Sequence, residues 1–174
     1  YAELAEGGKP ARELTLDPPI CLFSSSKAIT AMLVHKLAED GLVDLLNPIA
    51  MYLPDFGQNG KEKITRYQLL THKAAGPNVV KEGVPSEGLL DTDAVYELIC
   101  QAEPLCPDGR VTAYHAVTGG FVIAKLVERL TGKSISAYLD EVVRKPMGMK
   151  YFTYGLEPKY KSSVARNYQT GFKN

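Results

Sequence analysis

Residues 22–27, Leu22-Phe23-Ser24-Ser25-Ser26-Lys27, lead directly into a long apolar segment that continues to Glu39. Apolar residues at helical spacing predict a helix over about residues 24–39. They cover nearly the whole circumference of this helix, so we expect it to be buried. Gly41 follows at a position where helices commonly end.

Ser24 and Lys27 are three residues apart, so they share one face of this helix and their side chains can meet. A serine hydroxyl is a poor nucleophile until a base takes its proton. A lysine can be that base when burial or a positive neighbour disfavours its charged form. Lys27 would also face the positive end of the helix dipole. The alternative is a helix-capping serine beside a lysine that reaches into solvent, and four residues alone favour that alternative.

Composition excludes several classes of partner. The 174 residues suffice for one domain with a core. The net charge is zero, which indicates neither nucleic acid nor an anionic membrane as a partner, and no apolar run has transmembrane length.

The three cysteines, Cys21, Cys100 and Cys106, are interpreted as free thiols, which favours a reducing, cytoplasmic compartment. A Cys100–Cys106 bridge is the alternative. Histidines and cysteines are too scattered for metal ligands, and no cofactor is expected.

The rest of the chain is predicted to be mostly helical, with few strand signals. Thr65 and Gln68 have the spacing of a capping box, and Asp91 or Thr92 can cap a helix that ends near Gln101. Further helices are expected over residues 49–53, 117–130 and 134–145, a loop over residues 77–91 and a short strand over residues 11–16. The helix over residues 117–130 is expected to be fully buried.

Five segments in order along the chain resemble motifs of the serine β-lactamase and penicillin-binding-protein superfamily. The first is the Ser-x-x-Lys stretch itself. The others, in chain order, are residues 45–56 with Tyr52-Leu53-Pro54, residues 64–76 with Leu69-Leu70-Thr71-His72, Pro107-Asp108-Gly109 followed by Tyr114, and residues 126–149 with Pro146-Met147-Gly148-Met149. The pattern is similar to class C β-lactamase-related proteins, a group that includes carboxylesterases, D-amino-acid peptidases and acyltransferases.

The resemblance implies an α+β fold of the β-lactamase/transpeptidase type, in which a helical part and an antiparallel-sheet part enclose the active site. It implies Ser24 as the nucleophile, Lys27 as its general base and Tyr114 as a partner in proton transfer. The backbone N–H of Ser24 would be one oxyanion donor. Residues 1–174 would form a single partial domain, with a helical region over about residues 24–150.

The sequence departs from the family pattern at two places. The family's Tyr-x-Asn is Tyr114-His115-Ala116 here, so the asparagine that would contact a β-lactam side chain is absent. This favours the esterase-like branch. The third motif, Lys/His-Thr/Ser-Gly, is missing, and the nearest string, Gln169-Thr170-Gly171, is interpreted as a loop. We therefore expect a fragment without the C-terminal sheet and second oxyanion donor, whose own activity is in doubt.

His115, beside Tyr114, is the candidate substrate-binding residue, whereas His35 is expected at the core or its boundary and His72 is expected to brace the loop near the site. The predicted function is a serine hydrolase that forms an acyl-enzyme with a small-molecule ester or amide, first of all a carboxylesterase-type enzyme. The alternatives are an acyltransferase or D-amino-acid peptidase of the same family, or a catalytically silent relative with a structural or binding role. The oligomeric state is left open.

Overall fold

The computed structural model describes residues 13, 15–74, 91–106 and 109–167. The chain divides into two compact units, Ser24–Tyr138 on one hand and Tyr1–Phe23 with Leu139–Asn174 on the other. The described part is mostly helical and contains no β-strand; isolated bridges pair Ile20 with Ala165 and Pro48 with Thr65. The predicted loop over residues 77–91 lies outside the described residues, apart from Asp91.

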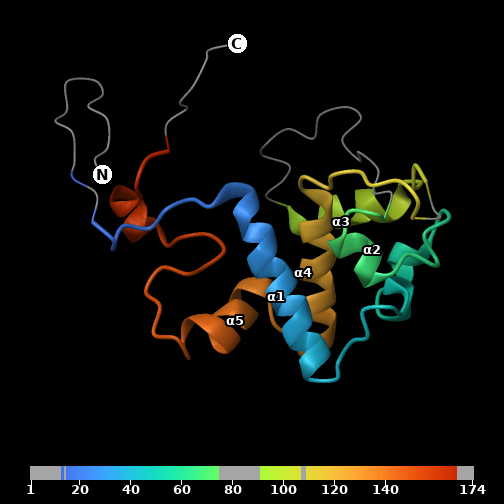
Figure 1. Cartoon of the computed structure of the whole chain (residues 1–174), viewed down its shortest axis with the longest axis horizontal. Coiled ribbons are helices and arrows are strands. Elements are labelled where there is room, and N and C mark those ends of the chain that lie inside the picture. The colour runs from blue at the N-terminus through green and yellow to red at the C-terminus, as the bar shows by residue number, and fades with distance from the viewer. Residues whose placement is uncertain (1–12, 14, 75–90, 107–108, 168–174) are drawn as a thin grey trace, which may run out of the picture. The chain divides into compact units, whose positions relative to one another are not determined.

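The unit Ser24–Tyr138 is built on two long helices, α1 (Ser26–Glu39) and α4 (Thr118–Thr131), which pack against each other (Figure 1). A short 3₁₀ turn, η1 (Phe23–Ser25), precedes α1. Each long helix buries one apolar face. The buried residues are Thr30, Leu33, Val34 and Leu37 on α1, and Val122, Ile123, Leu126 and Val127 on α4.

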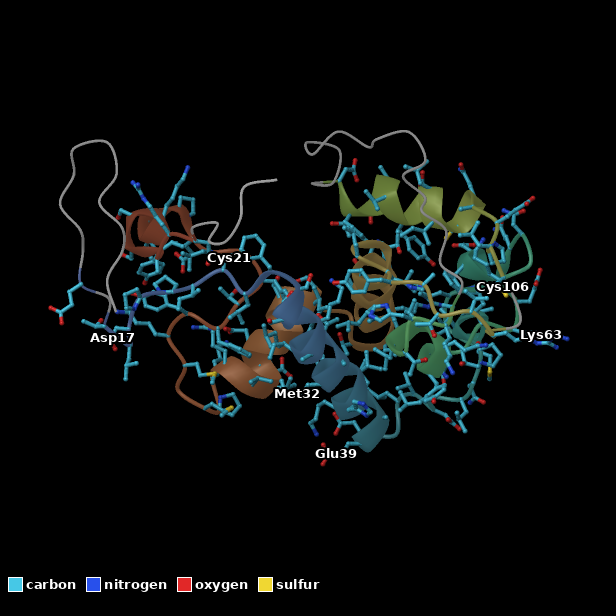
Figure 2. All side chains as sticks on the ribbon, turned by 45° about the horizontal axis from the view of Figure 1, so that its top comes forward. Asp17, Cys21, Met32, Glu39, Lys63 and Cys106 are labelled. Atoms are coloured by element: carbon cyan, nitrogen blue, oxygen red, sulfur yellow. The ribbon has the colours of Figure 1, made fainter. Side chains whose placement is uncertain are left out.

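The prediction that both long helices are fully buried is wrong for the described structure. On α1, Met32 is 40% exposed, and His35 is exposed rather than placed in the core or at its boundary. Glu39, at the end of α1, points away from the packed helices (Figure 2). On α4, Glu128 and Arg129 are exposed. A single buried stripe is enough to hold each helix, so the remaining apolar residues do not need burial.

Two shorter helices complete this unit, and the sequence predicted the start of each correctly. In α2 (Arg66–Leu70), Thr65 Oγ1 accepts from Gln68 N–H at 3.1 Å and Gln68 Oε1 accepts from Thr65 N–H at 2.8 Å, which is a full capping box. In α3 (Thr92–Gln101), Asp91 Oδ1 accepts from Ala94 N–H at 3.0 Å. The helix expected over residues 49–53 is instead one 3₁₀ turn, η2 (Ile49–Met51), and a second 3₁₀ turn, η3 (Pro54–Gly57), follows it.

Two buried cations join segments that are distant in sequence, and burial lowers the pKa of both. Lys61, 1% exposed, donates to the carbonyl oxygens of Cys100, at 2.9 Å, and Ala102. It thereby satisfies carbonyl groups at the end of α3. Arg66, also 1% exposed, donates through Nε to the carbonyl oxygen of Asp44 at 2.7 Å. The sequence analysis singled out neither residue.

At the C-terminal side, the helix expected over residues 134–145 is observed as α5 (Ile135–Leu139) continued by a π-turn, η5 (Asp140–Arg144). A 3₁₀ helix, η6 (Pro158–Ser163), follows. Thr15 and Leu16 are not in a strand, and residues 11, 12 and 14 of the predicted strand lie outside the described residues. No disulfide joins the three cysteines, so the alternative Cys100–Cys106 bridge is wrong.

Candidate active site

Ser24, Lys27 and Tyr114 are supplied by the starts of two helices. Ser24 lies in η1 and Lys27 in the first turn of α1. Tyr114 lies in the segment that enters α4, and α1 and α4 pack against each other. Two residues separated by 90 positions, Ser24 and Tyr114, thereby come into hydrogen-bonding contact.

The Ser24 hydroxyl oxygen is the meeting point of the three side chains. It accepts a hydrogen bond from the Tyr114 hydroxyl at 2.8 Å and one from Lys27 Nζ at 3.4 Å. Lys27 Nζ also lies 4.9 Å from the centroid of the Tyr114 ring. Ser25, which occupies the N-cap position of α1, makes no side-chain capping hydrogen bond. In the structure Ser24 thus contacts the two groups that could take its proton.

The neighbours of Tyr114 in this cluster lower the pKa of its hydroxyl group. Lys27 and then Ser24, both hydrogen-bonded to the phenol, hold the pKa of Tyr114 below its ordinary value. A cation beside the phenol favours the phenolate, as a nearby opposite charge does for any acid. Tyr114 is 56% exposed and Ser24 is exposed, whereas Lys27 is half-buried. The burial expected for Lys27 is therefore only partial.

Two non-glycine residues next to the cluster have a left-handed backbone. Phe23, which directly precedes Ser24 in the chain, has φ 47°, and His72 has φ 60°. Bulky side chains disfavour this region. Such strain is found most often at functional sites, where the surrounding structure holds it in place.

His72 and His115 lie behind Tyr114. The His72 ring is 5.0 Å from the Tyr114 ring and 5.3 Å from the His115 ring, measured between centroids. His115 is 5% exposed, and burial lowers its pKa, so its ring is neutral. A small, partly open cavity adjoins it, lined mainly by apolar residues, among them Phe56, Leu69 and Val122.

The part of the chain that the structure describes contains neither a metal-binding cluster nor a membrane-spanning helix. There, no three His, Cys, Asp or Glu side chains gather in a way that could hold a metal ion. Of the helices in that part, none has both the length and the apolar character needed to cross a bilayer. Pro107, Asp108 and the string Gln169-Thr170-Gly171 lie outside it.

Comparison with solved structures gives the class of fold. A penicillin-binding-protein homologue from Caulobacter crescentus is 28% identical and matches with a TM-score of 0.81 over 90% of this chain and 42% of its own. A family VIII carboxylesterase is 32% identical, with a TM-score of 0.75 over 82% of this chain and 39% of its own. The helices described above are therefore part of a β-lactamase/transpeptidase-like fold.

Sequence comparison leads to the family. The esterase/β-lactamase LipL of Mycobacterium tuberculosis is 33% identical over 140 residues, which cover 79% of this chain and 31% of that protein. The sequence model of the Beta-lactamase family matches residues 2–174, and the chain belongs to this family. Members of the family are serine hydrolases, among them esterases, β-lactamases and peptidases. The chain spans less than half the length of the relatives compared here.

Proposed function

We propose that the protein is a serine hydrolase that forms an acyl-enzyme on Ser24, with carboxylic esters as its substrates. The observation that carries the proposal is the double contact of one hydroxyl: Ser24 Oγ lies 2.8 Å from the Tyr114 hydroxyl and 3.4 Å from Lys27 Nζ. A serine held between a cation and a phenol of lowered pKa has a route by which to lose its proton.

The proposed reaction has two steps. Ser24 Oγ attacks the ester carbonyl carbon while its proton passes to the Tyr114–Lys27 pair, and the leaving alkoxide takes that proton as the ester C–O bond breaks. A water molecule then attacks the acyl carbon and gives a proton to the same pair, which returns it to Ser24 as the acid leaves. The backbone N–H of Ser24 would stabilise the oxyanion in both steps.

Esters are preferred over β-lactams in this proposal because of Ala116. It stands where the family pattern has an asparagine, and a methyl group cannot hydrogen-bond an amide side chain of a β-lactam. The family VIII carboxylesterase, whose name describes an esterase, supports the same choice. Substrate contact by His115 stays a prediction, because the residue is only 5% exposed and its ring packs against His72.

The test is a burst experiment on the full-length protein with a p-nitrophenyl ester, followed by peptide mass spectrometry. We expect one equivalent of p-nitrophenol and an acyl label on Ser24. Ser24→Ala should abolish both, whereas Ser25→Ala, the matched neighbour without a capping hydrogen bond, should retain them. A burst of unchanged size in Ser24→Ala would exclude Ser24 as the nucleophile. If the wild-type protein releases no p-nitrophenol from esters of several chain lengths, either as a burst or in the steady state, a catalytically silent relative would be favoured.

A further inference from the structure

The segment that carries Tyr114 is held on both sides by one residue, His72. The N–H of Ala113, which precedes Tyr114, donates to the carbonyl oxygen of His72 at 2.9 Å. The N–H of His115, which follows Tyr114, donates to His72 Nδ1 at 3.1 Å. The main chain and the side chain of His72 thus bind the two amides that flank the phenol.

His72 stands at a position where helices commonly have glycine. Just after α2, His72 N–H donates to the carbonyl oxygen of Leu69 at 3.2 Å and Lys73 N–H donates to that of Gln68 at 2.7 Å. These two bonds define a Schellman motif, in which the residue at the position of His72 is left-handed and is usually glycine. His72 adopts this conformation with φ 60° in spite of its Cβ.

The His72 side chain accepts a hydrogen bond that glycine could not accept. A glycine would form the same turn and keep the carbonyl bond to Ala113, but it would leave His115 N–H without the ring nitrogen. Because His72 Nδ1 accepts this hydrogen bond, it carries no hydrogen of its own in this arrangement. His115 is fixed in turn, since its own Nδ1 donates to the Ala113 carbonyl oxygen.

We propose that His72 is the positioning residue for Tyr114: its carbonyl oxygen and its ring hold the segment on both sides of the phenol, so that the phenol reaches Ser24. The inference rests on the proposed function of the Ser24 site. The strained backbone of His72 supports this positioning role, because backbone strain persists where the surrounding contacts hold it in place.

Two substitutions distinguish the contribution of the His72 ring from that of the left-handed turn. His72→Asn keeps an acceptor two bonds from Cβ, as Nδ1 is, and asparagine tolerates the left-handed region. His72→Gly suits the turn better still but removes the acceptor. In the full-length protein we expect His72→Asn to retain the burst rate within about threefold and His72→Gly to lose about tenfold or more, at similar melting temperatures.

A second readout needs no catalysis. The pKa of Tyr114 is measured from phenolate absorbance, as the difference between each protein and the same protein with Tyr114→Phe. It should stay low in His72→Asn and rise toward the ordinary value in His72→Gly, because the phenol moves away from Lys27. Amide hydrogen exchange supplies an internal control: in His72→Gly the His115 amide should exchange faster, while the Ala113 amide keeps its carbonyl acceptor.

The outcomes are decisive in either direction. If His72→Gly keeps both the burst rate and the low pKa of Tyr114, or if His72→Asn loses them as His72→Gly does, the positioning role is excluded. Should the glycine variant not fold, His72→Ser replaces it, since its hydroxyl is too short to reach His115 N–H. If the wild-type protein shows no burst, the proposed function fails. The Tyr114 titration and the amide exchange rates still test whether His72 positions Tyr114.

Discussion

Two polar atoms, Lys27 Nζ and Tyr114 Oη, lie within hydrogen-bonding distance of Ser24 Oγ. The two distances indicate which of these groups is better placed to take the serine proton. The phenol oxygen is nearer to Ser24 Oγ, at 2.8 Å against 3.4 Å for the amine nitrogen, and as the phenolate it could accept the serine proton. Lys27 acts on the phenol first through its hydrogen bond and also through its charge, and both lower the pKa of Tyr114. We therefore propose that Tyr114 receives the proton directly and that Lys27, expected from the sequence to be the general base, acts on it through Tyr114.

This ranking predicts the effect of Lys27→Met. Without the cation, the pKa of Tyr114 should rise toward its ordinary value of 10.0. The burst rate depends on the phenolate and increases as the pH approaches that pKa, so its rise should move to higher pH in the variant. The measurement is the pH profile of the burst in the full-length protein. Lys36→Met, at the far end of α1 where Lys36 pairs with Glu39 and Asp40, is the control and should leave the profile unchanged. A profile that does not move in Lys27→Met would contradict the ranking.

At the level of single residues, the sequence could supply only part of the site. The contact between Ser24 and Lys27 was predictable from their spacing, because residues three apart share one face of a helix, but their catalytic role was indicated only by the motif resemblance. Tyr114 is 90 positions from Ser24, and no local rule connects them, so only the motif resemblance pointed to it. The left-handed backbone of His72 could not be foreseen, because glycine is the usual signal for that conformation.

Secondary-structure elements differ in how much of their formation is local. The caps at Thr65 and Asp91 were predictable because each helix start is satisfied by a side chain within three residues. The buried cations were not, because a lysine or arginine normally reaches into solvent. Lys61 is buried only because two carbonyl oxygens at the end of α3 accept from it, some 40 residues further along the chain.

This dependence predicts that Lys61→Met destabilises the fold by about 1–3 kcal/mol, the cost of leaving buried carbonyl groups without a donor. The methionine keeps most of the apolar volume, so the loss reports mainly on the missing hydrogen bonds. Lys63, on the same loop, is exposed and points outward in Figure 2, and Lys63→Met is the matched control with no expected effect. Denaturant midpoints measure both. Equal midpoints for the two variants would show that Lys61 contributes nothing to the end of α3.

On the scale of the whole unit Ser24–Tyr138, the pairing of α1 with α4 relates the stability of the fold to the geometry of the site. Ser24 and Tyr114 stand just before these two helices, so packing along the helices brings the two segments together. The packed faces extend well beyond the site. Leu37 on α1 and Val127 on α4 are both 0% exposed. Leu37 lies 13 residues after Ser24, about 20 Å along a helix.

Because Leu37 lies far from the site, substitutions at Leu37 and at His72 should nevertheless separate the stability of the fold from the geometry of the site. Leu37→Ala leaves a cavity in the core and should cost about 2–5 kcal/mol of unfolding free energy. While the protein remains folded, the pKa of Tyr114 should stay low, because Leu37 is remote from Lys27. Leu46→Ala, at a side chain that is 70% exposed, is the control for the loss of a leucine. His72→Gly should show the reverse, a raised Tyr114 pKa with little loss of stability. If Leu37→Ala raised the pKa of Tyr114 under native conditions, the site would depend on the whole α1–α4 interface and not on the His72 contacts alone.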